Sequence, residues 1–271
     1  MEALQSIDLI SLSSADHESS FDFSPQSFDD YLGQEALKKK LKIYTQAAGM
    51  RKEALDHLLL FGPPGLGKTT LSRIMAQVMQ VGIKVCSGPM LERTGDLVAI
   101  LSSLQPRDIL FIDEIHRLPI VVEEVLYSAM ENFRVDIIIG QGAGAQSINL
   151  PLHPFTLIGA TTQSGKLSGP LRSRFGITER IDFYTLDELT AIIHQAANFL
   201  KLPIDHDAAQ RIAKSARGTP RIAKKLLRRI RDFVQVNRLE KADDQLTKQA
   251  LSFLGIDEDG LSTIDNLILK K

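Results

Sequence analysis

A glycine-rich stretch at residues 62–69 has the residue types and the spacing of a phosphate-binding loop. It reads GPPGLGKT and fits the pattern G-x-x-x-x-G-K-[ST]. In this pattern the glycines allow backbone N–H groups to close around phosphates, the lysine reaches the outer phosphates, and the hydroxyl meets Mg²⁺. We therefore expect the loop glycines, Lys68 and Thr69 to hold a phosphorylated ligand and its metal ion.

The flanking residues place this loop between a strand and a helix. An apolar run at residues 58–61 leads into the loop, and residues 70–76 continue with helical spacing. A helix N-terminus suits phosphate, because its N–H groups and its dipole favour an anion. The alternative interpretation is a glycine-rich turn with a surface lysine, and the order of strand, loop and helix argues against it.

Two carboxylates follow a second predicted strand. Residues 109–112 are apolar on both faces, which is typical of a buried strand, and they run directly into Asp113 and Glu114. Consecutive strand residues face opposite ways, so we expect Asp113 to hold Mg²⁺ and Glu114 to act as the general base for an attacking water. The alternative is that both carboxylates cap the next helix, as acidic residues commonly do.

Two further residues are candidates for contacting phosphate. The core strand predicted at 155–160 ends in a threonine pair, and Thr162 there could sense a γ-phosphate or orient the water. Arg221 falls in the first turn of a helix that Thr219 and Pro220 are well suited to begin. A cation at this end opposes the helix dipole, so a nearby phosphate would explain the arginine.

Two arginines lie in a short helix predicted after Ser168-Gly169-Pro170. Residues two apart do not share a helix face, so we expect only one of Arg172 and Arg174 to aim at a given anion.

Residues 134–150 predict a β-hairpin inserted between core elements, with a glycine-rich turn at 140–144. Its apolar side chains cannot all face inward on an excursion from the sheet, so we expect some of them to meet another protein. The alternative is a hairpin that folds back on its own domain. The isoleucines concerned are Ile137, Ile138, Ile139 and Ile148.

The order of the predicted elements defines an α/β fold followed by helices only. Strands alternate with helices up to about residue 184, which implies a parallel sheet with helices on both faces and a ligand at the carboxyl ends of the strands. From residue 187 onward the pattern is helical, so we expect a small all-α lid domain at 185–255. A serine-rich, acidic stretch at 1–20 predicts a disordered tail before a large domain at 21–184.

Composition and net charge indicate a globular protein with a sizeable core. The 271 residues are 44% hydrophobic, enough for a sizeable core, and the formal net charge of −1 gives no global field that would attract nucleic acid. The single cysteine, Cys86, excludes an internal disulfide and favours a reducing, cytoplasmic location. No apolar run approaches the roughly 18 residues of a membrane helix, and the scattered histidines are expected to be structural or surface residues.

Five segments together resemble the AAA+ ATPases and, more narrowly, the RuvB motors that drive branch migration of Holliday junctions. The similarity runs from about Phe23 to the C-terminus. The resemblance implies an AAA+ P-loop fold and an ATP-hydrolysing, ring-forming DNA motor. The segments are 56–59, 62–70, 113–118, 170–176 and 218–223.

The resemblance also implies a role for individual residues. Asp113 and Glu114 would form the Walker B pair, Thr162 would be sensor 1 and Arg221 sensor 2. Arg174 would be the finger offered to a neighbouring subunit's ATP, which makes hydrolysis depend on assembly. Further ATP contacts are implied for Gly65, Gly67, Lys68, Thr69, Thr70, Tyr184 and, towards the neighbour's nucleotide, Glu131, Asn132 and Phe133.

The partners implied by the resemblance are RuvA through the hairpin, Holliday junction DNA, further copies in a homo-hexamer, and RuvC in the wider complex. Two departures stand out. Ser24 replaces the arginine that usually precedes Pro25, which puts a nucleotide contact there in doubt. Residues 256–271 look like the start of a winged-helix head of which most is missing, and this leaves open a headless module that docks on RuvA without moving DNA. A clamp-loader-like ATPase is a third alternative.

Overall fold

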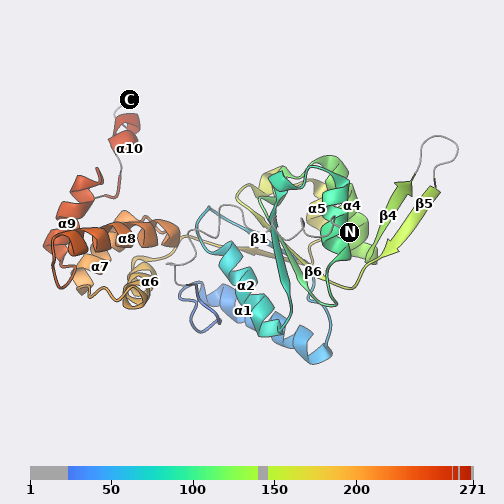
Figure 1. The fold of residues 1–271 in the computed structure, drawn as a ribbon, viewed down its shortest axis with the longest axis horizontal. Coiled ribbons are helices and arrows are strands. Elements are labelled where there is room, and N and C mark those ends of the chain that lie inside the picture. Colours follow the sequence, from blue (N-terminus) through green and yellow to red (C-terminus); the bar gives the residue numbers. More distant parts are fainter. Residues whose placement is uncertain (1–23, 140–145, 258, 262, 270–271) are drawn as a thin grey trace, which may run out of the picture. The chain divides into compact units, whose positions relative to one another are not determined.

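The computed structural model describes residues 24–139, 146–257, 259–261 and 263–269. These residues form two compact units (Figure 1). The first, here called the sheet unit, comprises Pro25–Glu188 together with Gly218–Arg221, and the second, the helical unit, comprises Leu189–Arg217 and the residues from Ile222 on. The tail predicted at 1–20 lies outside the described residues, and the predicted boundary at 185 stays a prediction.

The sheet unit is built on five parallel strands in the order β2-β3-β6-β1-β7. The three inner strands are almost completely buried, as their apolar sequences predict, whereas the edge strand β7 alternates between partly buried and exposed residues. The parallel sheet expected from the alternation of elements is therefore confirmed. The strands are β1 (Leu58–Phe61), β2 (Ile83–Ser87), β3 (Ile109–Asp113), β6 (Thr156–Thr161) and β7 (Ile177–Arg180).

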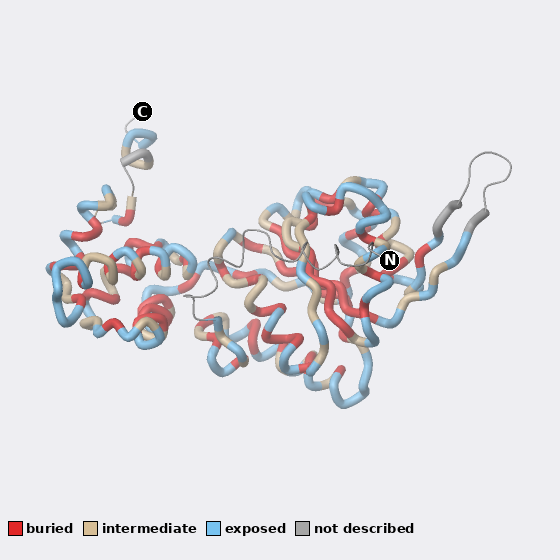
Figure 2. The backbone as a smooth tube through the Cα atoms, viewed as in Figure 1, coloured by how far each residue is buried: buried red, intermediate tan, exposed pale blue. Residues whose placement is uncertain are grey.

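Helices cover both faces of this sheet (Figure 1). Leucines of α3 and α4 pack with Leu110 and Leu157 of the inner strands in one large apolar cluster, and Figure 2 shows this buried interior. The helix α4 was not among the elements that the sequence pattern predicted. The helices are α1 (Glu35–Arg51), α2 (Lys68–Met79), α3 (Thr94–Ser102), α4 (Ile120–Asn132) and α5 (Gly169–Ser173).

A hairpin of β4 (Arg134–Ile139) and β5 (Gln146–Pro151) forms a separate antiparallel pair that extends away from the five-stranded sheet (Figure 1). Val135 at its base is buried in the core, but Ile148 farther along is 47% exposed. The turn at 140–144 lies outside the described residues, and only the backbone of Ile137 to Ile139 is described. The described part of the hairpin therefore stands off its own domain.

The helical unit confirms the change of pattern after residue 187. On α8 the buried residues recur at three- and four-residue steps from Ala223 to Val234, and this leaves the basic residues on the other face. Arg211 binds both carboxylate oxygens of Asp244 at 2.6 and 2.7 Å, which ties α7 to α9. The helices are α6 (Leu186–Phe199), α7 (His206–Ser215), α8 (Pro220–Val236), α9 (Asp244–Phe253) and α10 (Thr263–Leu269). Among the described helices, none has the length and apolar character needed to cross a bilayer.

His57, just before β1, is a structural histidine of the sheet unit. The N–H of Leu157 donates to its Nδ1 at 2.8 Å, so the proton lies on Nε2, which donates to the carbonyl of Met130 at 3.1 Å. Its ring also contacts Phe155 and Phe133, with centroids 5.5 and 6.3 Å away. Burial lowers the pKa of this imidazole, so it is neutral and fastens β6 and α4 to the start of β1.

Replacing His57 by leucine is expected to destabilise the protein by about 3 kcal/mol, because the buried Leu157 N–H and Met130 carbonyl both lose their partner. The measurement is the urea midpoint of unfolding. His153→Leu is the matched control, since His153 is exposed and its loss should leave the midpoint nearly unchanged. Equal midpoints for the two variants would contradict the structural role of His57.

Candidate nucleotide-binding site

The loop at 62–67 connects β1 to the N-terminus of α2 and has a backbone that only glycine fits. Gly62, Gly65 and Gly67 have φ angles of 150°, 78° and 98°. A Cβ on Gly67 would lie 2.7 Å from the hydroxyl of Tyr31, and one on Gly65 would lie 2.9 Å from Cβ of Arg221. The loop is thus closely covered on two sides, and it delivers the chain directly into the positive end of a twelve-residue helix.

Lys68 is the first residue of α2 and is 7% exposed. Its ammonium group donates to the carbonyls of Gly62 and Pro63 at 2.9 and 2.8 Å. Burial lowers the pKa of this amine, the carboxylates of Asp113 and Glu114 oppose that change, and Arg221 adds to it. The ammonium group is therefore buried between two carbonyls and close to two carboxylates. A polyphosphate with its cation can replace those carbonyls as its partner.

Asp113 and Glu114 lie where the sequence predicts, at the carboxyl end of β3. Asp113 is the last strand residue and its Oδ1 accepts the N–H of Glu114 at 3.0 Å. Glu114 has already left the strand, with φ at 51°, so a left-handed turn and not strand alternation sets the direction of its side chain. Glu114 makes no side-chain capping bond to the turn η3 (Ile115–Arg117), which argues against the capping interpretation.

The threonine pair at the end of β6 lies beside β3 in the sheet. Thr162 is half-buried just beyond the strand. Thr161 is fully buried, and its hydroxyl lies 2.8 Å from Nδ1 of His116 and accepts the N–H of Gln163 at 2.9 Å. The sequence pattern indicates Thr162 but not the Thr161–His116 contact, because a pairing across 45 residues leaves no local pattern.

The four residues Gly218–Arg221 group with the sheet unit and cover the loop. The N–H of Arg221 donates to the carbonyl of Gly65 at 3.3 Å, and the methyl of Thr219 would meet a Cβ on Gly65 at 3.0 Å. The guanidinium of Arg221 is close enough to lower the pKa of Lys68. The structure therefore brings Arg221 to the phosphate loop, as the sequence predicts.

A pair of tyrosines lies against the same loop. The hydroxyls of Tyr31 and Tyr184 are 2.6 Å apart, and each is 3.2 Å from the carbonyl of Leu66. Burial raises the pKa of Tyr31 to about 12 and raises that of Tyr184 as well. A Cβ on Gly33 would lie 2.7 Å from the Tyr184 ring, so glycine is required for this contact. Tyr184 is thus brought to the loop, and Tyr31 is a neighbour that sequence reasoning missed.

The remaining predicted ATP contacts differ in how far they are exposed. Thr69 and Thr70 lie half-buried in the first turn of α2. Ser24, the first residue that the structure describes, is exposed. Asn132 is exposed at the end of α4, whereas the ring of Phe133 packs inward, 5.9 Å from that of Phe155.

Arg174 belongs to a separate cluster between α4 and α5. Its guanidinium lies 4.4 Å above the centroid of the Tyr127 ring and 3.0 Å from Glu131. Nη1 donates to the carbonyl of Pro170 at 2.7 Å, while Nε is buried without a partner among the described residues. About a fifth of the side chain (21%) is exposed, so this arginine is held at the surface and is not sealed inside. Arg172 is exposed.

The donors near the loop suit magnesium. Mg²⁺ prefers hard oxygen ligands and takes few of them from the protein. The hydroxyl of Thr69 and the carboxylate of Asp113 are donors of this kind, while the described residues contain no group of three or more His, Cys, Asp or Glu side chains placed to hold a metal ion. A metal at this site would therefore be bound jointly with a phosphate ligand and not by the protein alone.

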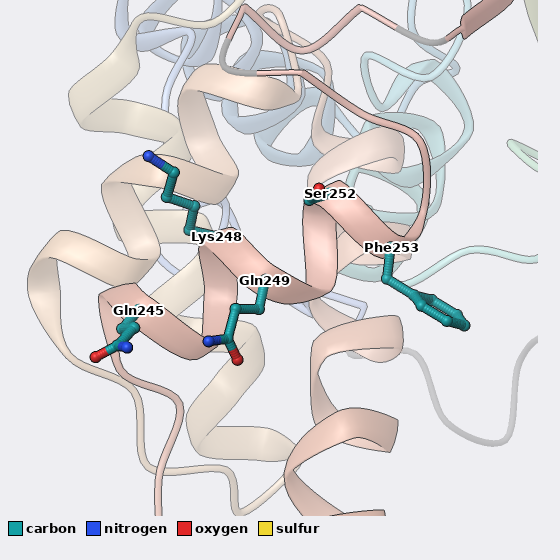
Figure 3. Close-up of a pocket in the computed structure, with 5 residues that line it drawn as sticks. All are labelled: Gln245, Lys248, Gln249, Ser252 and Phe253. Atoms are coloured by element: carbon teal, nitrogen blue, oxygen red, sulfur yellow. The ribbon is translucent and has the colours of Figure 1, made fainter.

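A shallow depression elsewhere is not part of this site. Figure 3 shows the side chains that line it, all on successive turns of α9 in the helical unit. Phe253 among them is largely exposed, and none belongs to the predicted nucleotide contacts. The lining residues are Gln245, Lys248, Gln249, Ser252 and Phe253.

The parallel sheet, the lysine-bearing loop and the paired carboxylates define a P-loop ATPase of the AAA+ class, with a helical lid. Comparison with known families identifies the family within this class of ATPase. The family described as "Holliday junction DNA helicase RuvB P-loop domain" matches residues 23–181, and "RuvB AAA lid domain" matches residues 184–257. The chain belongs to the RuvB family.

Similar proteins agree with this assignment. The "Holliday junction branch migration complex subunit RuvB" of Streptococcus pneumoniae (strain CGSP14) is 54% identical over 91% of this chain and 74% of its own length. The solved structure of the Thermotoga maritima RuvB Holliday junction branch migration motor has a TM-score of 0.83 and 50% identity, over 91% of this chain and 78% of that one. A proline-to-glycine variant of the same motor has a TM-score of 0.85 and 50% identity, over 92% and 79%.

Replacing Gly67 by alanine is expected to weaken nucleotide binding by at least about tenfold, because φ at 98° is strained for alanine and the new methyl would collide with Tyr31. Titration with a fluorescent ATP analogue measures the loss. Gly95→Ala is the control, since a Cβ there meets nothing within 4 Å. Unchanged affinity in the Gly67 variant would show that the loop does not hold the phosphates.

Proposed function

We propose that this chain hydrolyses ATP and uses the energy to drive branch migration at Holliday junctions, as a member of a ring of identical copies. The observation that carries the proposal is the buried Lys68 ammonium at the start of α2, bound to two loop carbonyls and close to Asp113 and Glu114. Family membership supports it, because the matching family and relatives are named for this activity.

Each residue of the site has a proposed part in hydrolysis. Lys68 exchanges its carbonyl partners for the outer phosphates, and Thr69 and Asp113 hold Mg²⁺, which neutralises phosphate charge when bound. Glu114 takes the proton of the attacking water, and Thr162 orients that water or senses the γ-phosphate. Arg221 contacts the phosphates from the covering segment, and Tyr184 lies near the base. Gly65, Gly67 and Thr70 line the ATP.

Completion of the site requires a second copy. Arg174 is held at the surface by Tyr127 and Glu131, where it can be presented to the nucleotide of a neighbour. An arginine supplied in trans contributes about 10³ to 10⁵ in rate, so an isolated copy should hydrolyse slowly. The end of α4 carries Glu131, Asn132 and Phe133, which are proposed to approach the neighbour's nucleotide. Phe133 is held in place by packing against Phe155 of its own copy. A hexamer is the proposed ring.

The hairpin is the proposed docking site for RuvA. Its described part extends from the sheet with Ile148 exposed, and Ile137, Ile138 and Ile139 are proposed to share that contact. Junction DNA is the proposed substrate. Association with RuvC and a cytoplasmic location stay predictions.

The comparisons favour the motor over the two alternatives. The relatives that match are named as branch-migration proteins, and this does not favour a module that docks on RuvA without moving DNA. A clamp-loader-like ATPase is not supported either, because both matching families are described as RuvB. Junction migration measured with RuvA and ATP separates all three.

Lys68→Ala is expected to abolish ATP hydrolysis and junction migration together, because the outer phosphates lose their cation. Release of labelled phosphate and conversion of a synthetic four-way junction are the two measurements. Lys39→Ala on the exposed face of α1 is the matched control and should keep both activities. Normal hydrolysis in the Lys68 variant would remove the basis of the proposal.

Ile148→Asp is expected to weaken association with RuvA about a hundredfold, since a carboxylate would be buried against an apolar surface. Sedimentation of the mixed proteins measures the association. Val236→Asp, at the exposed end of α8, carries the same change on another apolar surface residue and should bind RuvA normally. If the Ile148 variant bound as well as the control, the hairpin would not be the docking site.

A further inference from the structure

A buried imidazole connects Glu114 to the end of strand β6. Nδ1 of His116 lies 2.8 Å from the hydroxyl oxygen of Thr161, and Nε2 lies 3.5 Å from Oε2 of Glu114. The His116 side chain is 4% exposed and Thr161 is fully buried, whereas the Glu114 side chain is one-third exposed (34%). His116 therefore bridges a fixed point in the sheet and the more exposed carboxylate.

The amide of Gln163 sets the direction of this chain of contacts. Its N–H donates to the Thr161 oxygen at 2.9 Å, which leaves the hydroxyl proton of Thr161 free to point at Nδ1 of His116. A neutral imidazole has one acceptor and one donor nitrogen, so an accepting Nδ1 places the proton on Nε2, facing Glu114. The hydrogen bonds therefore run in one direction, from amide to hydroxyl to imidazole, and the N–H of the imidazole faces the carboxylate at 3.5 Å.

The backbone around Glu114 is fixed independently of its side chain. Its φ of 51° is uncommon for a residue other than glycine, and its carbonyl accepts the N–H of Arg117 at 2.8 Å. Ile115, fully buried, anchors the short turn η3, and a Cβ on Gly88 would lie 2.6 Å from the Glu114 carbonyl oxygen. The freedom that remains is rotation of the carboxylate, and Nε2 of His116 faces it at 3.5 Å.

We propose that His116 and Thr161 are positioning residues that aim the Glu114 carboxylate at the attacking water. Thr161 prevents the imidazole from rotating, and the imidazole directs one carboxylate oxygen. Because Thr161 adjoins Thr162, any movement of the end of β6 would also reach Glu114. This inference rests on the proposed function and deepens it, since it names the residues that orient the general base.

Thr161→Val removes the hydroxyl that contacts His116 with little change in side-chain volume. We expect kcat for ATP, measured with junction DNA and RuvA present, to fall about tenfold while KM and nucleotide affinity change less than about twofold. Thr161→Ser restores the hydroxyl and should recover most of the rate. Thr156→Val is the matched control at the other end of β6, where the lost hydroxyl donates to the Leu55 carbonyl. It should lower stability and leave kcat unchanged.

His116→Phe distinguishes the proposed role of the His116–Thr161 contact from a structural role of the turn at Thr161. It keeps a ring at position 116 and leaves the Thr161–Gln163 contact in place. It should lower kcat as much as Thr161→Val does, and adding Thr161→Val to it should cost less than about twofold more. Should Thr161→Val not fold, His116→Phe alone carries the same comparison of kcat with KM.

Two outcomes would overturn the inference. The first is an unchanged kcat in Thr161→Val or in His116→Phe. The second is a double variant whose fold-loss in kcat equals the product of the two single fold-losses. Both would leave the proposed function intact as long as the unaltered chain hydrolyses ATP. Absence of hydrolysis in the unaltered chain would instead refute the proposed function itself.

Discussion

The site depends on one buried charge. The Lys68 ammonium is nearly inaccessible to water, and a buried cation is costly unless negative or carbonyl groups surround it. The loop supplies two carbonyls, and β3 supplies the carboxylates of Asp113 and Glu114. Those carbonyls are available only because glycines with positive φ turn the chain so sharply. A triphosphate with its metal ion would satisfy the same charge, so the loop is already arranged for such a ligand.

Sheet topology explains why distant residues meet at this charge. In the order β3-β6-β1, three adjacent parallel strands end at the same edge, and they lead into Glu114, Thr162 and Gly62. These residues span about a hundred positions of sequence, yet the crossover helices return each strand to the same edge. The helices α3, α4 and α5 pack on the sheet through one apolar cluster. Function at the edge therefore rests on ordinary packing in the middle of the sheet.

The sequence predicted the elements whose signal is local and missed those whose signal is tertiary. Uniformly apolar runs predicted β1, β3 and β6, and the glycine-rich motif at 62–69 predicted the loop. The helix α4 escaped notice because Ile120 and Val121 at its start are exposed, which blurs the apolar stripe. Tyr31 was missed because its partner Tyr184 lies 153 residues away, and the role of His116 is visible only once Thr161 is beside it. Strand alternation failed at Glu114, one residue beyond the strand.

In the proposed ring, each nucleotide lies between two copies, with Lys68 on one and Arg174 on the other. Mixing inactive Lys68→Ala copies with inactive Arg174→Ala copies tests it most directly. In a ring of head-to-tail copies mixed at random in equal amounts, about a quarter of the sites would combine an intact Lys68 with an intact neighbouring Arg174. ATP hydrolysis should then return to about that fraction of the normal rate. A mixture as inactive as either variant alone would contradict a shared site.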